Sequence, residues 1–232
     1  PSTDGWTINS LVDESGVHLS FGIDNAAELA NWKGALTKSW GDPTLSDPTK
    51  YIALGDSGLV LQSLSLSVDG DPMIAVRFSV LNTTNVATPF HYELPAVVYP
   101  IQYPKGTATA AVTVTDCDGN GATATGAFNG AFYRAFYNTT TTEQTFKYLV
   151  NGPIVANPYD TATKSETYAP WHSIGVPVAD IKAEFGFTLS GNDSAAGTSS
   201  FTVIPAPEPT TIAAMVMGVL GMGGFALRRR KA

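Results

Sequence analysis

Residues that interrupt regular structure recur about every ten residues along this chain, and the segments between them are the length of short strands. Pro (15) and Gly (22) are spread through the sequence instead of being gathered in one linker. The segment Leu59–Val68 passes from a continuous apolar run into strict alternation, which is typical of a strand with one buried face. Further strands are predicted at Trp6–Leu11, Val17–Phe21, Met73–Leu81, Phe90–Leu94, Thr107–Thr115, Ala122–Phe128, Ala131–Tyr137, Glu143–Val150, Ile181–Leu189 and Ser199–Ile204.

Two of these segments also predict a hairpin. Residues 69–72 between Leu59–Val68 and Met73–Leu81 form a turn signal, and Pro72 is confined to the connection because it lacks an N–H for a sheet. Extended over residues 1–204, the pattern predicts an all-β body, an antiparallel β-sandwich that is jelly-roll-like. A body of about 200 residues is within the range of a single β domain.

One segment departs from the strand pattern. Residues 24–33 begin with Asp24 and Asn25 as candidate caps, continue with good helix formers and precede Gly34, so they predict one short helix over an end of the sandwich. Residues 37–50 and 151–172 are predicted to be long loops.

The end of the chain has a different composition. Residues 212–227 contain no charged or polar side chain, and a helix of these 16 residues would be about 24 Å long. With Thr210 and Thr211 included and long basic side chains reaching the interface, this length allows a membrane span. Residues 228–232 are then a cytoplasmic end. Its basic cluster consists of Arg228, Arg229, Arg230 and Lys231. The alternatives are a buried core helix or an apolar segment packed against a neighbouring subunit.

The residues before the apolar run complete a pattern. Residues 205–211 form a Pro-rich linker that contains Pro207, Glu208 and Pro209 in succession. Each proline fixes φ at about −65° and removes an N–H donor, so the triplet is expected to be extended and unavailable to a sheet. A Pro-Glu-Pro triplet, an apolar run and a basic cluster in this order resemble the PEP-CTERM sorting signal over residues 205–232.

That resemblance implies a route for the protein. The triplet would be recognised by an exosortase, a membrane-embedded enzyme with a cysteine nucleophile, and residues 212–227 would anchor the precursor temporarily in the inner membrane. The mature protein would then reach the cell surface or the extracellular matrix of a Gram-negative-type bacterium that makes exopolysaccharide. A first residue of Pro1 in place of Met is compatible with a removed export signal.

The charge of the body excludes one class of partner. The whole chain has a net charge of −7 and residues 206–232 contribute +3, from one acid and four bases, so residues 1–205 carry −10. Such a body would be repelled by nucleic acid. Charged residues make up only 14% of the chain, and Ser, Thr, Gly and Asn take their place.

The sequence shows no pattern that indicates catalysis. His18, His91 and His172 lie far apart, and there is no nucleophile elbow, phosphate loop or dinucleotide fingerprint. Cys117 is the single cysteine, which excludes an intrachain disulfide and is most simply a free thiol near a turn. We therefore expect a protein that is not an enzyme, with a secreted hydrolase as the second alternative.

One turn has the composition of a cation site. Asp116, Asp118 and Asn120 alternate along a short Gly-rich segment, so their oxygens are able to converge on a calcium ion. The segment lacks the Gly and Glu spacing of an EF-hand loop. The competing interpretation is a hairpin connection, in which Asp-Gly and Asn-Gly are preferred. No cofactor other than this calcium ion is expected.

Aromatic residues near predicted loops suggest a sugar-binding surface. Trp32, Trp40 and Trp171 offer flat apolar faces on which sugar rings stack, although core packing and loop pinning are the commoner roles. The expected function is a structural protein of the surface or biofilm matrix that associates with exopolysaccharide or with copies of itself. A carbohydrate-binding, lectin-like module is the first alternative.

Overall fold

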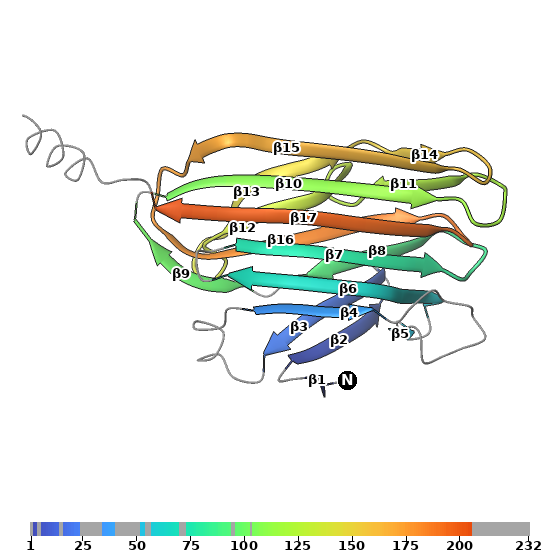
Figure 1. The fold of residues 1–232 in the computed structure, drawn as a ribbon, viewed down its shortest axis with the longest axis horizontal. Coiled ribbons are helices and arrows are strands. Elements are labelled where there is room, and N and C mark those ends of the chain that lie inside the picture. The colour runs from blue at the N-terminus through green and yellow to red at the C-terminus, as the bar shows by residue number, and fades with distance from the viewer. Residues whose placement is uncertain are drawn as a thin grey trace, which may run out of the picture.

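The computed structural model describes residues 2–3, 6–13, 16–23, 34–39, 52–53, 57–69, 73–93, 96–102 and 104–205, with the side chains of 57–65, 73–93, 96, 98, 100–102 and 104–205. Every regular element within these residues is a β-strand, and the strands form two sheets, here called sheet A and sheet B. Figure 1 shows the two sheets layered against each other. The predicted all-β body with two sheets is confirmed for this part of the chain.

Sheet A has the strand order β1-β2-β3-β8-β16-β11-β14, with β12 and β9 also paired to β16 and β13 paired to β12. Its strands are β1 Ser2–Thr3, β2 Trp6–Asp13, β3 Gly16–Ile23, β8 Thr88–Glu93, β9 Val97–Ile101, β11 Ala122–Gly126, β12 Ala131–Tyr137, β13 Gln144–Asn151, β14 Ile154–Ala156 and β16 Val178–Leu189. All pairs are antiparallel except β3 with β8, which is parallel.

Sheet B has the order β15-β10-β17-β7-β6-β4, with β5 paired to β6, and all its pairs are antiparallel. Its strands are β4 Gly34–Ser39, β5 Ile52–Ala53, β6 Leu59–Asp69, β7 Met73–Asn82, β10 Pro104–Thr115, β15 Thr161–Ser173 and β17 Ser194–Pro205. The predicted hairpin is confirmed, because β6 and β7 pair from Asp69 opposite Met73 to Leu59 opposite Asn82.

The core lies between the two sheets and is built from alternating side chains. Burial alternates along all of β10, so one of its faces packs inward while Lys105, four threonines and Ala111 occupy the other. Phe78 of β7 reaches across to sheet A, where its ring lies 5.0–6.1 Å from the rings of Phe90, Tyr92, Phe185 and Phe187. This aromatic cluster joins the two layers at their centre.

The predicted loop over residues 151–172 is wrong, because β14 and most of β15 lie within it. Residues 37–39 of the other predicted loop belong to β4. The strand β15 has polar or exposed residues on both faces, so it shows no alternation. It forms because its backbone pairs with β10 over most of its length, and Thr113–Thr163 and Thr115–Thr161 hydroxyl hydrogen bonds of 2.9 Å reinforce the pairing.

Four further predicted segments lie outside the described residues. They are the short helix at 24–33, the part of the linker 205–211 beyond Pro205, the apolar helix at 212–227 and the basic end at 228–232. Within the part of the chain that the structure describes, no helix is long and apolar enough to span a bilayer.

Candidate functional site

The loop between β10 and β11 is organised around the carboxylate of Asp116. This buried carboxylate accepts hydrogen bonds from the backbone N–H groups of Gly119, Gly121 and Tyr159, the first two at 2.9 Å. Gly119 and Gly121 have φ of +87° and +91°, a conformation that L side chains adopt only with strain. The glycines therefore allow the loop to wrap around Asp116.

Two further carboxylates approach Asp116. Ligand oxygens of Asp116, Asp118 and Asp193 all lie within 4.8 Å of one another. Asp193 is fully buried at the turn between β16 and β17, where it accepts hydrogen bonds from the Cys117 N–H and the Ser190 hydroxyl. Sequence reasoning missed Asp193 because it lies 75 residues beyond Asp118 in the chain. We call Asp116, Asp118 and Asp193 the acidic triad.

Asn120, the third residue predicted to bind the cation, does not point its side-chain oxygen at the carboxylates. The Asn120 side-chain amide donates to Asp118 at 2.7 Å, so its nitrogen faces the carboxylate. The Asn192 amide also donates to Asp118, at 3.3 Å. The structure thus brings Asp116 and Asp118 together and adds Asp193, while Asn120 acts on Asp118 through its N–H.

The pKa values of Asp116 and Asp193 are shifted in opposite directions. Burial opposes ionisation of Asp116, but the N–H groups of Tyr159, Gly121 and Gly119 hold its pKa below the ordinary value. Burial raises the pKa of Asp193, and the charges of Asp116 and Asp118 add to this effect. A divalent cation between the carboxylates would relieve both the burial cost and the repulsion, and carboxylate oxygens are the ligands that Ca²⁺ prefers.

The calcium hypothesis predicts a measurable gain in stability. Calcium at about 100 times its dissociation constant should raise the free energy of unfolding by about 2.7 kcal/mol, with heat released or absorbed on titration. Asp118→Ala should abolish both signals because it removes one ligand. Asp160→Ala is the matched control, since Asp160 lies in the neighbouring turn outside the triad. Equal calcium binding by wild type and Asp118→Ala would contradict the hypothesis.

A second cluster of charges, not predicted from the sequence, lies on the outer face of sheet A. Glu184 of β16 is 4% exposed and accepts from Arg134 of β12 through Nε at 2.9 Å and Nη2 at 2.7 Å. His91 Nε2 of β8 lies 3.4 Å from the same carboxylate, and Lys182 Nζ lies 3.7 Å from its other oxygen. Lys182 also pairs with Glu93. Strand pairing places Arg134, Glu184 and Glu93 in one row, which is how residues distant in sequence meet.

The environment of this cluster holds Glu184 ionised. Burial opposes its charge, but hydrogen bonds from His91 and Arg134, and the charge of Arg134, keep its pKa below the ordinary value. Burial lowers the pKa of Lys182. The Arg134 guanidinium also lies 4.6 Å from the centre of the Phe136 ring and 5.1 Å from that of Phe128. Cations and carboxylates here neutralise one another, so the arrangement ties β8, β12 and β16 together.

Of the three tryptophans predicted to bind sugar, the structure describes one. Trp171 is 43% exposed near the end of β15, whereas Trp32 and Trp40 lie outside the described residues. Next to it in the chain, residues 173–177 line a hollow of about 310 Å³ together with Gln102. Tyr168 and His172, which precede and follow Trp171 in the same strand, stack on each other with their ring centres 3.6 Å apart.

The sorting residues Pro207, Glu208 and Pro209 also lie outside the described residues, as does the basic cluster of the tail. The last described residue is Pro205 at the end of β17, which pairs with Pro104. The triplet therefore begins two residues after a strand of the central part of sheet B.

Comparison with known proteins identifies no family for this chain. No family model matches it, and no curated protein does. A structure of the infectious bursal disease virus Gx strain is 12% identical, covers 75% of this chain and 51% of the viral chain, and has a TM-score of 0.31. A structure of the Gt strain is 14% identical over 68% of this chain and 54% of that chain, with a TM-score of 0.16. This chain spans about half the length of these two viral chains.

Proposed function

We propose that this chain is an exported, non-catalytic structural protein of the cell surface or biofilm matrix, anchored temporarily by its tail and released by an exosortase. The observation that carries the proposal is the order of three tail segments. Pro207, Glu208 and Pro209 precede the apolar run 212–227, and the basic cluster 228–231 follows it. Each segment has one physical role: an extended substrate, a span, and a cytoplasmic stop.

For the body, we propose a jelly-roll-like sandwich that associates with copies of itself or with exopolysaccharide. Its supporting feature is the outer face of sheet B, where small hydroxyl and methyl side chains project from adjacent strands. A shallow hollow of about 400 Å³ lies on this face, and among the described residues of its lining one, Arg77, is charged. Its lining residues are Ser65, Ala75, Val76, Arg77, Thr109, Thr198, Ser199 and Ser200. A face whose described residues carry little charge offers weak resistance to association.

The edge strand β15 also supports self-association. Among the described strands β15 pairs only with β10, so its other edge presents backbone donors and acceptors. The C=O groups of Asp160 and Tyr168 accept from the Asp116 N–H and the Thr107 hydroxyl on the β10 side. By alternation, Thr163, Ser165 and Thr167 present their backbone groups to the free edge. The two charged side chains within β15 bond elsewhere: Lys164 donates to the Asn151 carbonyl, and Glu166 accepts from the Val150 N–H.

The test is the mass and the assembly state of protein released from cells that contain an exosortase. We expect the mature protein to lack the residues beyond about 209, because the enzyme acts at the extended triplet next to the membrane. Replacing Pro207 and Pro209 with alanine should stop release, whereas Pro205→Ala, just outside the triplet, should not. Electron microscopy of the released body should show assemblies.

Three outcomes would contradict this proposal. A released mass that retains Arg228–Lys231 would exclude processing at the triplet. Monodisperse particles that bind one polysaccharide tightly on a glycan array would favour the carbohydrate-binding alternative. Turnover of a polymer substrate would favour the secreted hydrolase.

A further inference from the structure

The length of the linker determines how far the body can lie from a membrane. Only residues 206–211 separate the end of β17 from the apolar run, and six extended residues span at most about 20 Å. The polar headgroup layer outside the hydrocarbon is about 5–7 Å thick on each side. Once the tail is inserted, the end of the sandwich that carries Pro205 must therefore stay close to the bilayer surface.

Several segments meet at that end of the sandwich. Pro205 of β17 pairs with Pro104 at the start of β10, and the Ile174 N–H donates to the Pro104 carbonyl at 2.9 Å. Figure 1 shows β15 and β17 ending where β10 begins. The loop 174–177 and the residues around Pro104 are thus beside the point from which the tail starts. We call this the tail end of the body.

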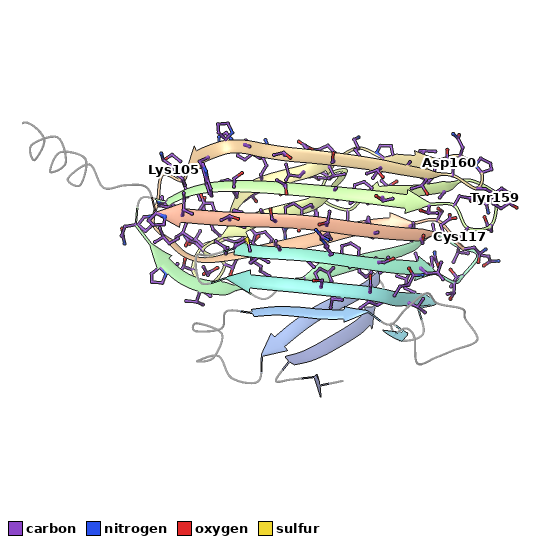
Figure 2. All side chains as sticks on the ribbon, in the orientation of Figure 1. Lys105, Cys117, Tyr159 and Asp160 are labelled. Carbon is purple, nitrogen blue, oxygen red and sulfur yellow. The ribbon has the colours of Figure 1, made fainter. Side chains whose placement is uncertain are left out.

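The tail end exposes the kind of side chains that bind at a lipid headgroup layer. Trp171 is 43% exposed near the end of β15. Val176 is 45% exposed and belongs to the lining of the hollow of about 310 Å³ formed by residues 173–177 and Gln102. Tryptophan is enriched at membrane interfaces because its ring is apolar and its N–H is polar. Lys105 lies at the same end, as Figure 2 shows, and its ammonium group suits an anionic headgroup.

The opposite end of the body carries a cluster of acids. It carries Asp160 and the acidic triad, and Figure 2 shows Asp160, Cys117 and Tyr159 there, far from Lys105. Exposed apolar side chains also occur at this end, Tyr159 among them, so apolar exposure alone does not select an orientation. The charges select the orientation, because an anionic bilayer attracts Lys105 and repels a cluster of aspartates.

We propose that the tail end, through Trp171, Val176 and Lys105, is a docking surface for an anionic lipid bilayer that holds the precursor upright on the membrane. The inference rests on the proposed anchoring by residues 212–227. In this orientation the triplet at 207–209 lies at the bilayer surface, within reach of a membrane-embedded enzyme. The 12 residues of β10 span about 40 Å, so the opposite end would lie well beyond the headgroups.

The chain provides a matched pair of probe sites for a test. Cys117 is the only cysteine and is exposed at the opposite end, so an environment-sensitive fluorophore attached there reports the distal position. The proximal probe is the same fluorophore on Val176→Cys in a Cys117→Ser background. The full chain is reconstituted in vesicles of phosphatidylcholine and phosphatidylglycerol, with and without a spin label on the lipid headgroup.

We expect a large loss of emission from the probe at position 176 and none from the probe at Cys117. Trp171→Ser should weaken the quenching at position 176, whereas Tyr159→Ser at the opposite end should not. Raising the salt from about 0.1 M to about 1 M, which shortens the Debye length from about 10 Å to about 3 Å, should also weaken it. Because both replaced side chains are exposed, circular dichroism should show an unchanged fold.

Flotation of the vesicles separates failure of this inference from failure of the anchoring. A chain that floats with vesicles while neither probe is quenched retains its anchor but overturns the docking surface. Quenching at both sites means that the body lies flat, which also overturns it. A chain that does not float overturns the anchoring and the docking surface together. An emission change at position 176 caused by soluble polysaccharide, without quenching by the labelled lipid, would assign the surface to glycan binding instead.

Discussion

Replacement of Phe78 by alanine should lower the free energy of unfolding by about 3–5 kcal/mol, the range for truncating a fully buried aromatic side chain. The Phe78 ring is the part of β7 that meets sheet A, and it contacts Phe90, Tyr92, Phe185 and Phe187. Its removal would leave a cavity that both sheets line. Urea unfolding followed by intrinsic fluorescence measures the loss.

Gly197 provides a test of whether that cost comes from packing. It pairs with Phe78 across β17 and β7, and a Cβ at position 197 would lie 2.4 Å from the Phe78 ring. Gly197→Ala should therefore destabilise the wild type by about 1–3 kcal/mol but cost much less in the Phe78→Ala background. Additive effects of the two substitutions would contradict this account. Val86→Ala, at a side chain that is 59% exposed, is the control and should stay within about 0.5 kcal/mol.

Replacement of Glu184 by alanine should cost about 3–5 kcal/mol, because it leaves partly buried cations without their carboxylate. Arg134 would lose two hydrogen bonds and Lys182 one of its two partners. Glu143→Ala is the control, since Glu143 is 46% exposed and lies 3.7 Å from Arg134. That change should cost at most about 1 kcal/mol. Equal losses from the two substitutions would show that burial does not strengthen the Glu184 pair.

The cost of Glu184→Ala should also depend on pH. Because the folded protein holds the pKa of Glu184 below its ordinary value, the unfolded chain binds the proton more readily at acidic pH. The stabilisation is therefore fully present above the unfolded pKa of about 4.3 and is lost as the pH falls through the folded pKa. Measured from pH 7 downward, the difference in stability between wild type and Glu184→Ala should shrink below about pH 4. A difference that stays constant with pH would contradict this assignment.

The strand pattern of the body was predictable because burial of one face imposes a period of two on the sequence. The hairpin of β6 and β7 followed from Leu59–Val68, the turn at 69–72 and Met73–Leu81. The strand β10 was predictable for the same reason, since its apolar and threonine positions alternate. In the acidic triad, Asp116 and Asp118 were predictable because both belong to one short turn. Asp193 was not, because only the folded chain brings the turn between β16 and β17 beside them.

The sequence by itself determined the strand periodicity of the body, the polar turn at 116–121 and the tail pattern at 205–232, because each depends on neighbours along the chain. Tertiary structure alone decided the rest. Apolar and polar residues do not alternate along 161–173, so the sequence does not predict a strand there. Pairing with β10 makes this segment a strand, because backbone hydrogen bonding does not require an apolar face. Likewise Arg134 and Glu184, 50 residues apart, meet only because β12 and β16 pair in one register. Long-range pairing is a property of the assembled sheets, and no local pattern encodes which partner a strand will find.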